Sequence, residues 1–541
     1  MSRVADRSRR SLLQMAAASA AAAMLPYPAK SQAKTWNGGD VAHLIPTASH
    51  ERFLIKASFQ NARSEAPVLR VDGQATTGSK TDLAGKFWQF DAQDLEAGKE
   101  YTLQLFEGGG GEITETWPLK TFPAPGTTPP KMRILAFTCA GGMDGPILDD
   151  GKTGFLDMAA RHRLLERGIA FEPDVVISNG DHIYWDIKTS MNKPYADFMR
   201  KQYWDPIGGE LDTNRPMLDP RNADIFQALC DHQIAGLYGT RLRSSPSFFV
   251  TDDHDMFEND EFTENLATQP ADSYGLRAAE LTQFMYYPEL LPYGQPYENW
   301  LDGGLRAGRA SGSNMLYGSI RYGDLMETVI YDCRRMIDYK GKHARILPQA
   351  AENWIIDRTL SEDTLHFMHC PSMPFGYSSG KLGDWYPDNL DEKTGKLVMY
   401  NPKAGWQSGW YGQHQRLLEA LSLQQKRAPV IMQGDFHASG AGQIYQSGEL
   451  SFSRPIETVL TGALGTGDTG FPSSMRSVET MPSQLIGMEQ LMETSEKNGF
   501  TVIDVTEDSI TYSMYTWRPP EPLDNIDTME PILVRTVPRN V

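Results

Sequence analysis

Metal-binding side chains follow several short apolar runs of the sequence. Each run is too short for a helix and rich in β-branched residues, which predicts a buried strand. Gly180 lets the chain turn sharply after one of these strands, and ligands of open α/β sheets collect at the carboxyl edge. The candidate ligands are Cys139, Asp181, Tyr184, Asp253 or Asn259, Asp435 and His437. This set contains more ligand groups than one cation needs, and about as many as two or three cations need.

The chemistry of these groups is that of a hydrolytic metal centre. The carboxylate of Asp181 has two oxygens and can bridge two cations. Two cations about 3.5 to 4 Å apart clamp an in-line displacement and activate a bridging hydroxide as the nucleophile, so that no serine is needed. A thiolate and a phenolate suit ferric iron, whereas carboxylates and amides suit Ca²⁺, Mn²⁺ or Mg²⁺. The structural alternative is a turn aspartate, a packed tyrosine and a small buried cysteine.

Two further strand ends carry side chains with more than one interpretation. Arg334 and Arg335 follow a predicted strand over 324–331. They could hold an oxyanion in bidentate fashion, or they could lie in a solvated turn and pair with Asp332. His369 follows a predicted strand over 364–368. It is either a metal ligand or a structural histidine.

The elements that must position these residues alternate between strands and helices from residue 131 to 541. The strand at 133–137, a helix at 155–167 and the strand at 175–177 predict a β-α-β unit. Further helices are predicted at 278–286, 348–360 and 413–423, and strands at 247–250, 429–432, 456–460 and 501–516. The Pro-rich last twenty residues are expected to wrap the surface.

A separate β module is predicted over residues 35–128. Its short runs alternate with period two between Gly, Asn, Asp and Pro turns, and residues 95–102 resemble the turn and strand of fibronectin type III domains. We therefore expect an all-β sandwich. The Pro-rich segment 121–130 is the predicted linker to the α/β domain.

Residues 1–33 have the order of a twin-arginine signal peptide: Ser8–Leu13 with two arginines, an apolar run, and a small-residue site at Ser31–Ala33. We expect export by the twin-arginine machinery to a periplasmic or secreted location. The formal charge of -18 argues against a nucleic-acid-binding surface. Four cysteines are not a disulfide framework, and pairing among Cys230, Cys333 and Cys370 is left open.

The series of motifs, in order and spacing, resembles the PhoD family of alkaline phosphatases and phosphodiesterases, calcineurin-like metallophosphoesterases related to purple acid phosphatases. The matching segments are Cys139, NGDHIY at 179–184, DDHDMFEND at 252–260, DCR at 332–334 and GDFHAS at 434–439. The resemblance implies a four-layer αββα catalytic domain that holds Fe³⁺ and one or two Ca²⁺ ions, with Mn²⁺ or Mg²⁺ as alternatives.

The resemblance also implies roles for individual residues. Those implied to bind iron are Cys139, Asp181, Tyr184 and His437, with Asp181 bridging to calcium. Asp435 and either Asn259 or Asp253 would bind calcium, His254 would protonate the leaving oxygen, and Arg334 would hold the phosphoryl group. The sequence departs from the family pattern at His182, Asp255 and Asp260.

The expected function is that of a secreted phosphomonoesterase or phosphodiesterase, a monomer acting on phosphate esters of small molecules or lipids. One alternative is a phospholipase-D-like phosphodiesterase whose Tyr-rich segment 262–325 accepts a lipid head group. The other is a non-catalytic, metal-stabilised surface binding protein.

Overall fold

The computed structural model describes residues 36–144, 152–185, 200–256 except 213, 274–293, and 310–539 except 382–383. The predicted signal peptide and Asn259 lie outside this part of the chain. Within it, no helix is long and apolar enough to cross a membrane.

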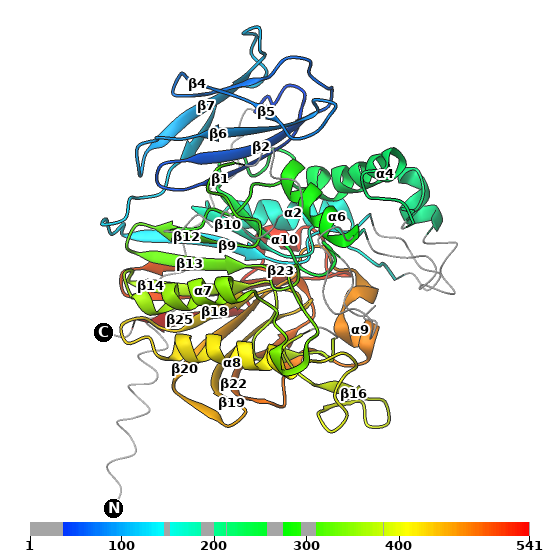
Figure 1. The fold of residues 1–541 in the computed structure, drawn as a ribbon, viewed down its shortest axis with the longest axis vertical. Helices are drawn as coiled ribbons and strands as arrows, with labels where there is room; N and C mark the ends of the chain where they lie inside the picture. The colour runs from blue at the N-terminus through cyan, green and yellow to red at the C-terminus, as the bar shows by residue number, and fades with distance from the viewer. Residues whose placement is uncertain are drawn as a thin grey trace, which may run out of the picture. The chain divides into compact units, whose positions relative to one another are not determined.

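The N-terminal strands form two four-stranded antiparallel sheets (Figure 1), as the alternating pattern predicts. One sheet has the order β1-β2-β6-β5, with bounds Val41–Ala48, Phe53–Phe59, Phe87–Ala92 and Ser79–Lys80. The other has the order β4-β3-β7-β8, with bounds Gln74–Thr77, Val68–Val71, Glu100–Phe106 and Trp117–Lys120. Strand β7 alternates between buried and exposed residues over most of its length, whereas every residue of β2 is buried. The predicted boundary near residues 128–131 stays a prediction.

A mixed α/β region follows, and its first sheet has six strands in the order β11-β10-β9-β23-β24-β25. Their bounds are Ser247–Val250, Val175–Asn179, Lys131–Phe137, Asn498–Thr506, Ser509–Trp517 and Leu533–Pro538. Strands β9, β10 and β11 are parallel, and helix α2 (Met158–Ile169) connects β9 to β10 in the predicted β-α-β unit. The expectation for the last twenty residues was wrong in part, because β25 pairs with β24 as an edge strand.

The second sheet has seven strands in the order β12-β13-β14-β18-β20-β19-β22. Their bounds are Tyr317–Tyr322, Met326–Tyr331, His366–Pro371, Val430–Gln433, Leu450–Thr461, Ser439–Ser447 and Ile486–Ser495. Strands β13, β14, β18 and β20 are parallel, and α7 (Gln349–Ser361) and α8 (Ser408–Ser422) lie along this sheet (Figure 1). His369 lies inside β14, because the strand continues to Pro371 instead of ending before the histidine.

The remaining helices and strands connect or cover the two sheets. The helical segments are η1 (Arg200–Trp204), η2 (Asp205–Ile207), α4 (Pro220–Cys230), η3 (Asp231–Ala235), α5 (Gly236–Tyr238), α6 (Tyr274–Met285), η5 (Gly341–His343), η6 (Asp468–Gly470), α9 (Pro472–Arg476) and α10 (Asn525–Thr528). The short strands are β15 (Tyr377–Ser378), β16 (Asn389–Asp391), β17 (Lys396–Val398) and β21 (Met481–Pro482).

The two large sheets are joined close to the ends of β9 and β20. Thr138 forms an isolated parallel bridge with Ala463, and its backbone N–H donates to the carbonyl of Gly462 at 3.0 Å. Thr501 on β23 donates its hydroxyl to the carbonyl of Thr461 at 3.0 Å. Strand β18 lies parallel to β20, with Gln433 opposite Leu460, so that the carboxyl ends of β9 and β18, from different sheets, come to one place.

A buried lysine ties the N-terminal strands to the mixed α/β region. The ammonium of Lys56 on β2 donates to the Gln89 side chain at 2.6 Å and to the Phe284 carbonyl at 2.9 Å. It also lies 3.2 Å from a carboxylate oxygen of Glu289, and both side chains of this ion pair are 0% exposed. Removing one partner leaves the other charge buried and unpaired, which is the costly way to break such a pair.

We therefore predict that Lys56→Met lowers the free energy of unfolding by about 3–5 kcal/mol. Lys56→Met/Glu289→Gln should recover a large part of that loss, because the second substitution removes the stranded charge. Equilibrium unfolding in urea measures both. A single variant as stable as the wild type would show that this ion pair does not hold the two regions together.

Candidate metal centre

Three candidate ligands occupy the same position after three different strands. Cys139, Asp181 and Asp435 each lie two residues beyond the end of β9, β10 and β18, and each has a positive φ of 46°, 55° and 66° respectively. Non-glycine residues rarely adopt this conformation, which costs of order 1–3 kcal/mol and is found most often at functional sites. The shared backbone conformation turns each side chain toward a common space.

Glycines allow the strand ends to approach one another. A Cβ atom on Gly180, whose φ is 83°, would lie 2.5 Å from the Cβ of Asp252. One on Gly434 would lie 2.5 Å from the carbonyl oxygen of Asn179. Both distances are far below van der Waals contact, so a larger residue would push the loops apart.

The first group of ligands surrounds one oxygen of Asp181. Its Oδ2 lies 3.3 Å from the Cys139 sulfur and 3.0 Å from the Tyr184 hydroxyl, which is itself 3.3 Å from His437 Nε2. The ligand atoms of Cys139, Asp181 and His437 all lie within 4.8 Å of one another. The structure therefore brings together the four residues implied to bind iron.

His437 is held in the form that can bind a metal. Its Nδ1 lies 2.5 Å from the carbonyl oxygen of Gly470, and a donor at that position leaves Nε2 with its lone pair. Burial lowers the pKa of His437 to about 4, so that the imidazole is neutral at pH 7. A backbone partner of this kind fixes the tautomer of metal-binding histidines.

A second group shares Asp181 with the first. One carboxylate oxygen from each of Asp181, Asp252 and Asp253 comes within 4.8 Å of the others. Asp181 Oδ1, Asp252 Oδ2 and Asp253 Oδ1 are buried and have no hydrogen-bond partner in the described part of the chain. Buried carboxylate oxygens need a positive partner, so this group fits a cation of the hard type.

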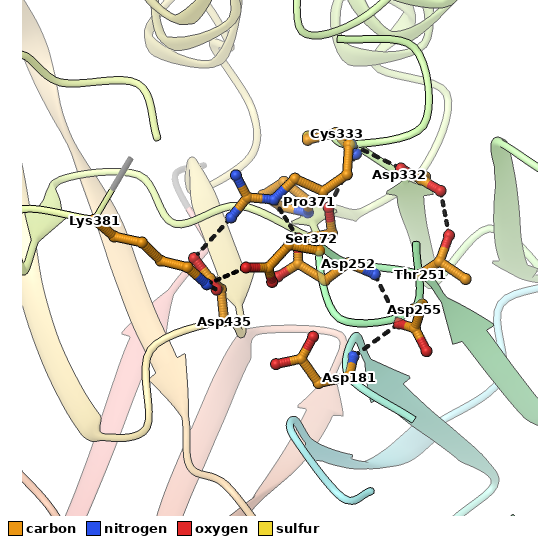
Figure 2. Close-up of polar contacts among 12 residues, drawn as sticks. Asp181, Thr251, Asp252, Asp255, Asp332, Cys333, Pro371, Ser372, Lys381 and Asp435 are labelled. Atoms are coloured by element: carbon orange, nitrogen blue, oxygen red, sulfur yellow. Dashed lines mark hydrogen bonds and ion pairs between the residues drawn. The ribbon is translucent and has the colours of Figure 1, made fainter. Parts of the chain in front are cut away.

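The loops that carry the second group are fixed by Asp255 (Figure 2). Its buried carboxylate accepts hydrogen bonds from the backbone N–H groups of Asp181, His182 and Asp252 at 2.9, 3.0 and 2.9 Å. Three charge-assisted bonds to two different loops set the separation of Asp181 and Asp252.

The electrostatics of the site favour cation binding. Burial, followed by the charge of Asp181, raises the pKa of the Cys139 thiol and of the Tyr184 phenol well above their usual values. Burial and the charge of Asp253 raise the pKa of Asp181 to about 7. These groups ionise together only if positive charge is supplied, and the donor set therefore fits a pair of cations.

Asp435 forms ion pairs with the cationic side chains of Lys381, which reaches it in Figure 2, and of Arg334. The Lys381 ammonium lies 2.5 Å from one oxygen of Asp435 and 2.6 Å from Asp253 Oδ2. Arg334 donates to the other oxygen of Asp435 at 3.0 Å and to Asp252 at 2.6 Å. Arg334 is thus placed between carboxylates, and its expected contact with a phosphoryl group stays a prediction.

A small hollow, partly open to solvent, leads to the centre. It is lined by His254, Ser379, Lys381, Asp435, Phe436, His437, Pro472, Met475 and Arg476. The His254 ring packs against Tyr184 with 4.2 Å between ring centroids. The hollow combines cationic and imidazole groups on one side of the candidate metal ligands, as an anionic substrate requires.

Comparison with known proteins agrees with this geometry. The model of a family described as PhoD-like phosphatases matches residues 152–514. The chain belongs to the PhoD-like phosphatase family. Membership of this family supports a phosphoesterase and confirms the resemblance drawn from the motifs.

Among solved structures, the PhoD-like chain is similar to one described as "Structure of PhoD". The TM-score is 0.59 at 14% identity, over 94% of this chain and 92% of that chain, which shows a shared fold. A β-glucuronidase from Ruminococcus gnavus in complex with an N1-substituted uronic isofagomine aligns with a TM-score of 0.20 at 9% identity, over 70% of this chain and 58% of that chain. That second likeness is too weak to support an argument. No curated protein matches.

His369 and His182 of this PhoD-like chain have structural partners away from the candidate ligands. His369 contacts the Tyr331 hydroxyl at 3.0 Å through Nδ1 and the Thr359 hydroxyl at 2.9 Å through Nε2, and burial lowers its pKa to about 3. His182 Nε2 lies 2.9 Å from the carbonyl oxygen of Val250, within hydrogen-bond distance. All four cysteines are free thiols, which answers the open question about pairing.

Sequence reasoning missed three residues of the site in this PhoD-like protein: Asp252, Asp255 and Lys381. Asp252 and Asp255 belong to the acidic run 252–260 that was recognised, so the signal was present but did not say which carboxylate faces inward. Lys381 had no local signal. Arg335 was expected to be solvated if paired with Asp332, but both side chains of that 3.2 Å pair are 0% exposed.

Two buried histidines give a matched test of the ligand assignment. We predict that His437→Gln loses about one metal equivalent per chain, because Nε2 belongs to the first group. His369→Gln should keep the full metal content and lose about 1–3 kcal/mol of stability, because its hydroxyl partners lose buried hydrogen bonds. Elemental analysis and urea unfolding separate the two effects. Equal metal loss in both variants would contradict the assignment.

Proposed function

We propose that this PhoD-like phosphatase hydrolyses phosphate monoesters or diesters at a centre of two cations that share the carboxylate of Asp181. The observation that carries the proposal is the presence of two ligand groups with Asp181 in common. Fe³⁺ suits the first group because thiolate and phenolate ligands favour an oxidised metal. Ca²⁺ suits the all-carboxylate second group, with Mn²⁺ or Mg²⁺ as alternatives.

Bound cations would activate the attacking water and neutralise charge on the phosphoryl oxygens. The residues of the chain would hold the cations and position the substrate. Cys139, Tyr184 and His437 hold one side of the centre, and Asp252 and Asp253 hold the other. The ester would approach through the hollow, where the lining residues Lys381 and Arg476 attract the negatively charged substrate.

His254 is the proposed proton donor to the leaving oxygen. It lines the hollow, and its ring is positioned by packing against Tyr184. A general acid must come within hydrogen-bond reach of the leaving group, and the mouth of the centre is the place where an ester oxygen departs. Arg334 is proposed to act on the phosphoryl group through the carboxylates that it positions, Asp252 and Asp435.

Three broader proposals accompany the activity. The two N-terminal sheets form a fibronectin-III-like sandwich, and the large sheets with their helices form an αββα arrangement, supported by the fold shared with PhoD. The motif at residues 8–13 supports export by the twin-arginine machinery to the periplasm or beyond, and we propose that the exported protein is a monomer. The substrates are phosphate esters of small molecules or lipids.

The test is hydrolysis of p-nitrophenyl phosphate and bis(p-nitrophenyl) phosphate by the metal-loaded protein. His254→Gln should lower kcat by about 10²–10⁴-fold on phenyl esters, and by less on p-nitrophenyl esters, because a good leaving group needs little protonation. His50→Gln, a change at a partly exposed histidine in the N-terminal module, is the matched control.

Two results would contradict these assignments. A protein with two cations per chain that hydrolyses neither ester would overturn the phosphoesterase proposal. A His254→Gln defect that is the same for good and poor leaving groups would remove His254 as the proton donor.

A further inference from the structure

The ammonium of Lys381 lies where a cation would be expected between two carboxylates. It is 2.5 Å from Asp435 Oδ1 and 2.6 Å from Asp253 Oδ2, and its side chain is only 7% exposed. Buried ion pairs at these distances are strong only where geometry is held fixed. Lys381 comes from the segment after β15, which belongs to neither of the large sheets.

The backbone of Lys381 is fixed by a second buried lysine. Lys403 donates to the carbonyl oxygen of Lys381 and forms an ion pair with Asp384, and both side chains of that pair are 0% exposed. Asp384 also accepts a hydrogen bond from the backbone N–H of Tyr386 at 3.1 Å. An arrangement with this many buried partners sets the position of the Lys381 ammonium before any metal binds.

The oxygens of Asp435 are therefore divided between two protein cations, Lys381 on Oδ1 and Arg334 on Oδ2. Around the centre, Asp181 Oδ1, Asp252 Oδ2 and Asp253 Oδ1 are buried without a partner in the described part of the chain, and these three residues already form the second ligand group. The family resemblance implied one or two calcium ions with Asp435 as a ligand. The side chains around Asp435 do not fit the second of them.

We propose that Lys381 is a built-in cation of this centre, which holds Asp253 and Asp435 in place of a further divalent ion. This inference rests on the two-cation centre proposed above. It limits the centre to two metal ions, one in each ligand group, and makes Asp435 a positioning residue whose charge is balanced by the protein. The ammonium also lines the hollow, where it contributes a fixed positive charge close to the substrate.

Metal stoichiometry tests the proposal without reference to activity. Purified wild-type protein, equilibrated with iron and then titrated with millimolar Ca²⁺, should hold one iron and one calcium per chain by elemental analysis. Lys381→Ala vacates the position between Asp253 and Asp435 and should bind about one additional Ca²⁺. Lys381→Arg, which keeps the positive charge, should not.

Two matched controls sharpen the result. Lys340→Ala removes the same charge from an exposed lysine and should leave the stoichiometry unchanged. Lys381→Ala/Asp435→Asn should lose the additional Ca²⁺, which locates it at Asp435. Circular dichroism of each variant confirms that it is folded, and Lys381→Gln replaces Lys381→Ala if the latter does not fold.

The proposal is overturned if the wild type binds two Ca²⁺ ions and Asp435→Asn loses one of them, or if the folded variant without Lys381 binds no more Ca²⁺ than the wild type. A failure of the proposed function looks different. In that case the metal counts follow the expected pattern, while the wild type hydrolyses neither phosphate ester.

Discussion

The crowding of buried carboxylates around Asp181 is the constraint on which the rest of the site depends. Asp181, Asp252 and Asp253 are each 0% exposed and carry oxygens without hydrogen-bond partners among the described residues. Such groups are tolerated in a protein interior only when positive charge compensates them. Protein cations supply that charge on the outer side, through Arg334 and Lys381, and leave the inner oxygens for metal ions.

The fold supplies the backbone precision that this arrangement needs. Parallel strands from two sheets end at one place because bonds around Thr138 join the sheets there. Positive φ values at Cys139, Asp181 and Asp435 then aim three side chains inward, and Asp255 ties the loops after β10 and β11 together. The strain of these loops is carried by the surrounding hydrogen bonds, so that the ligand positions exist before metal binds.

The sequence predicted the strands and their ligands where local pattern and function coincide. Apolar runs such as Val175–Ile177 define buried strands by composition alone, and a donor that follows such a run reaches the sheet edge. Lys381 and the burial of Asp435 between cations could not be predicted, because ion pairs between residues 54 positions apart leave no local pattern. His369 was expected just after its strand, whereas it lies inside the strand. Sequence patterns define strand ends only to within a few residues.

Anomalous X-ray diffraction from crystals of the protein loaded with iron and calcium tests the central claim most directly. Data collected above and below the iron absorption edge should locate iron about 2.3 Å from the Cys139 sulfur and in contact with Asp181. A second cation should lie about 3.5–4 Å from the iron, on the Asp252 side of the same carboxylate. Metal peaks that do not share Asp181, or a single cation in the centre, would contradict the account.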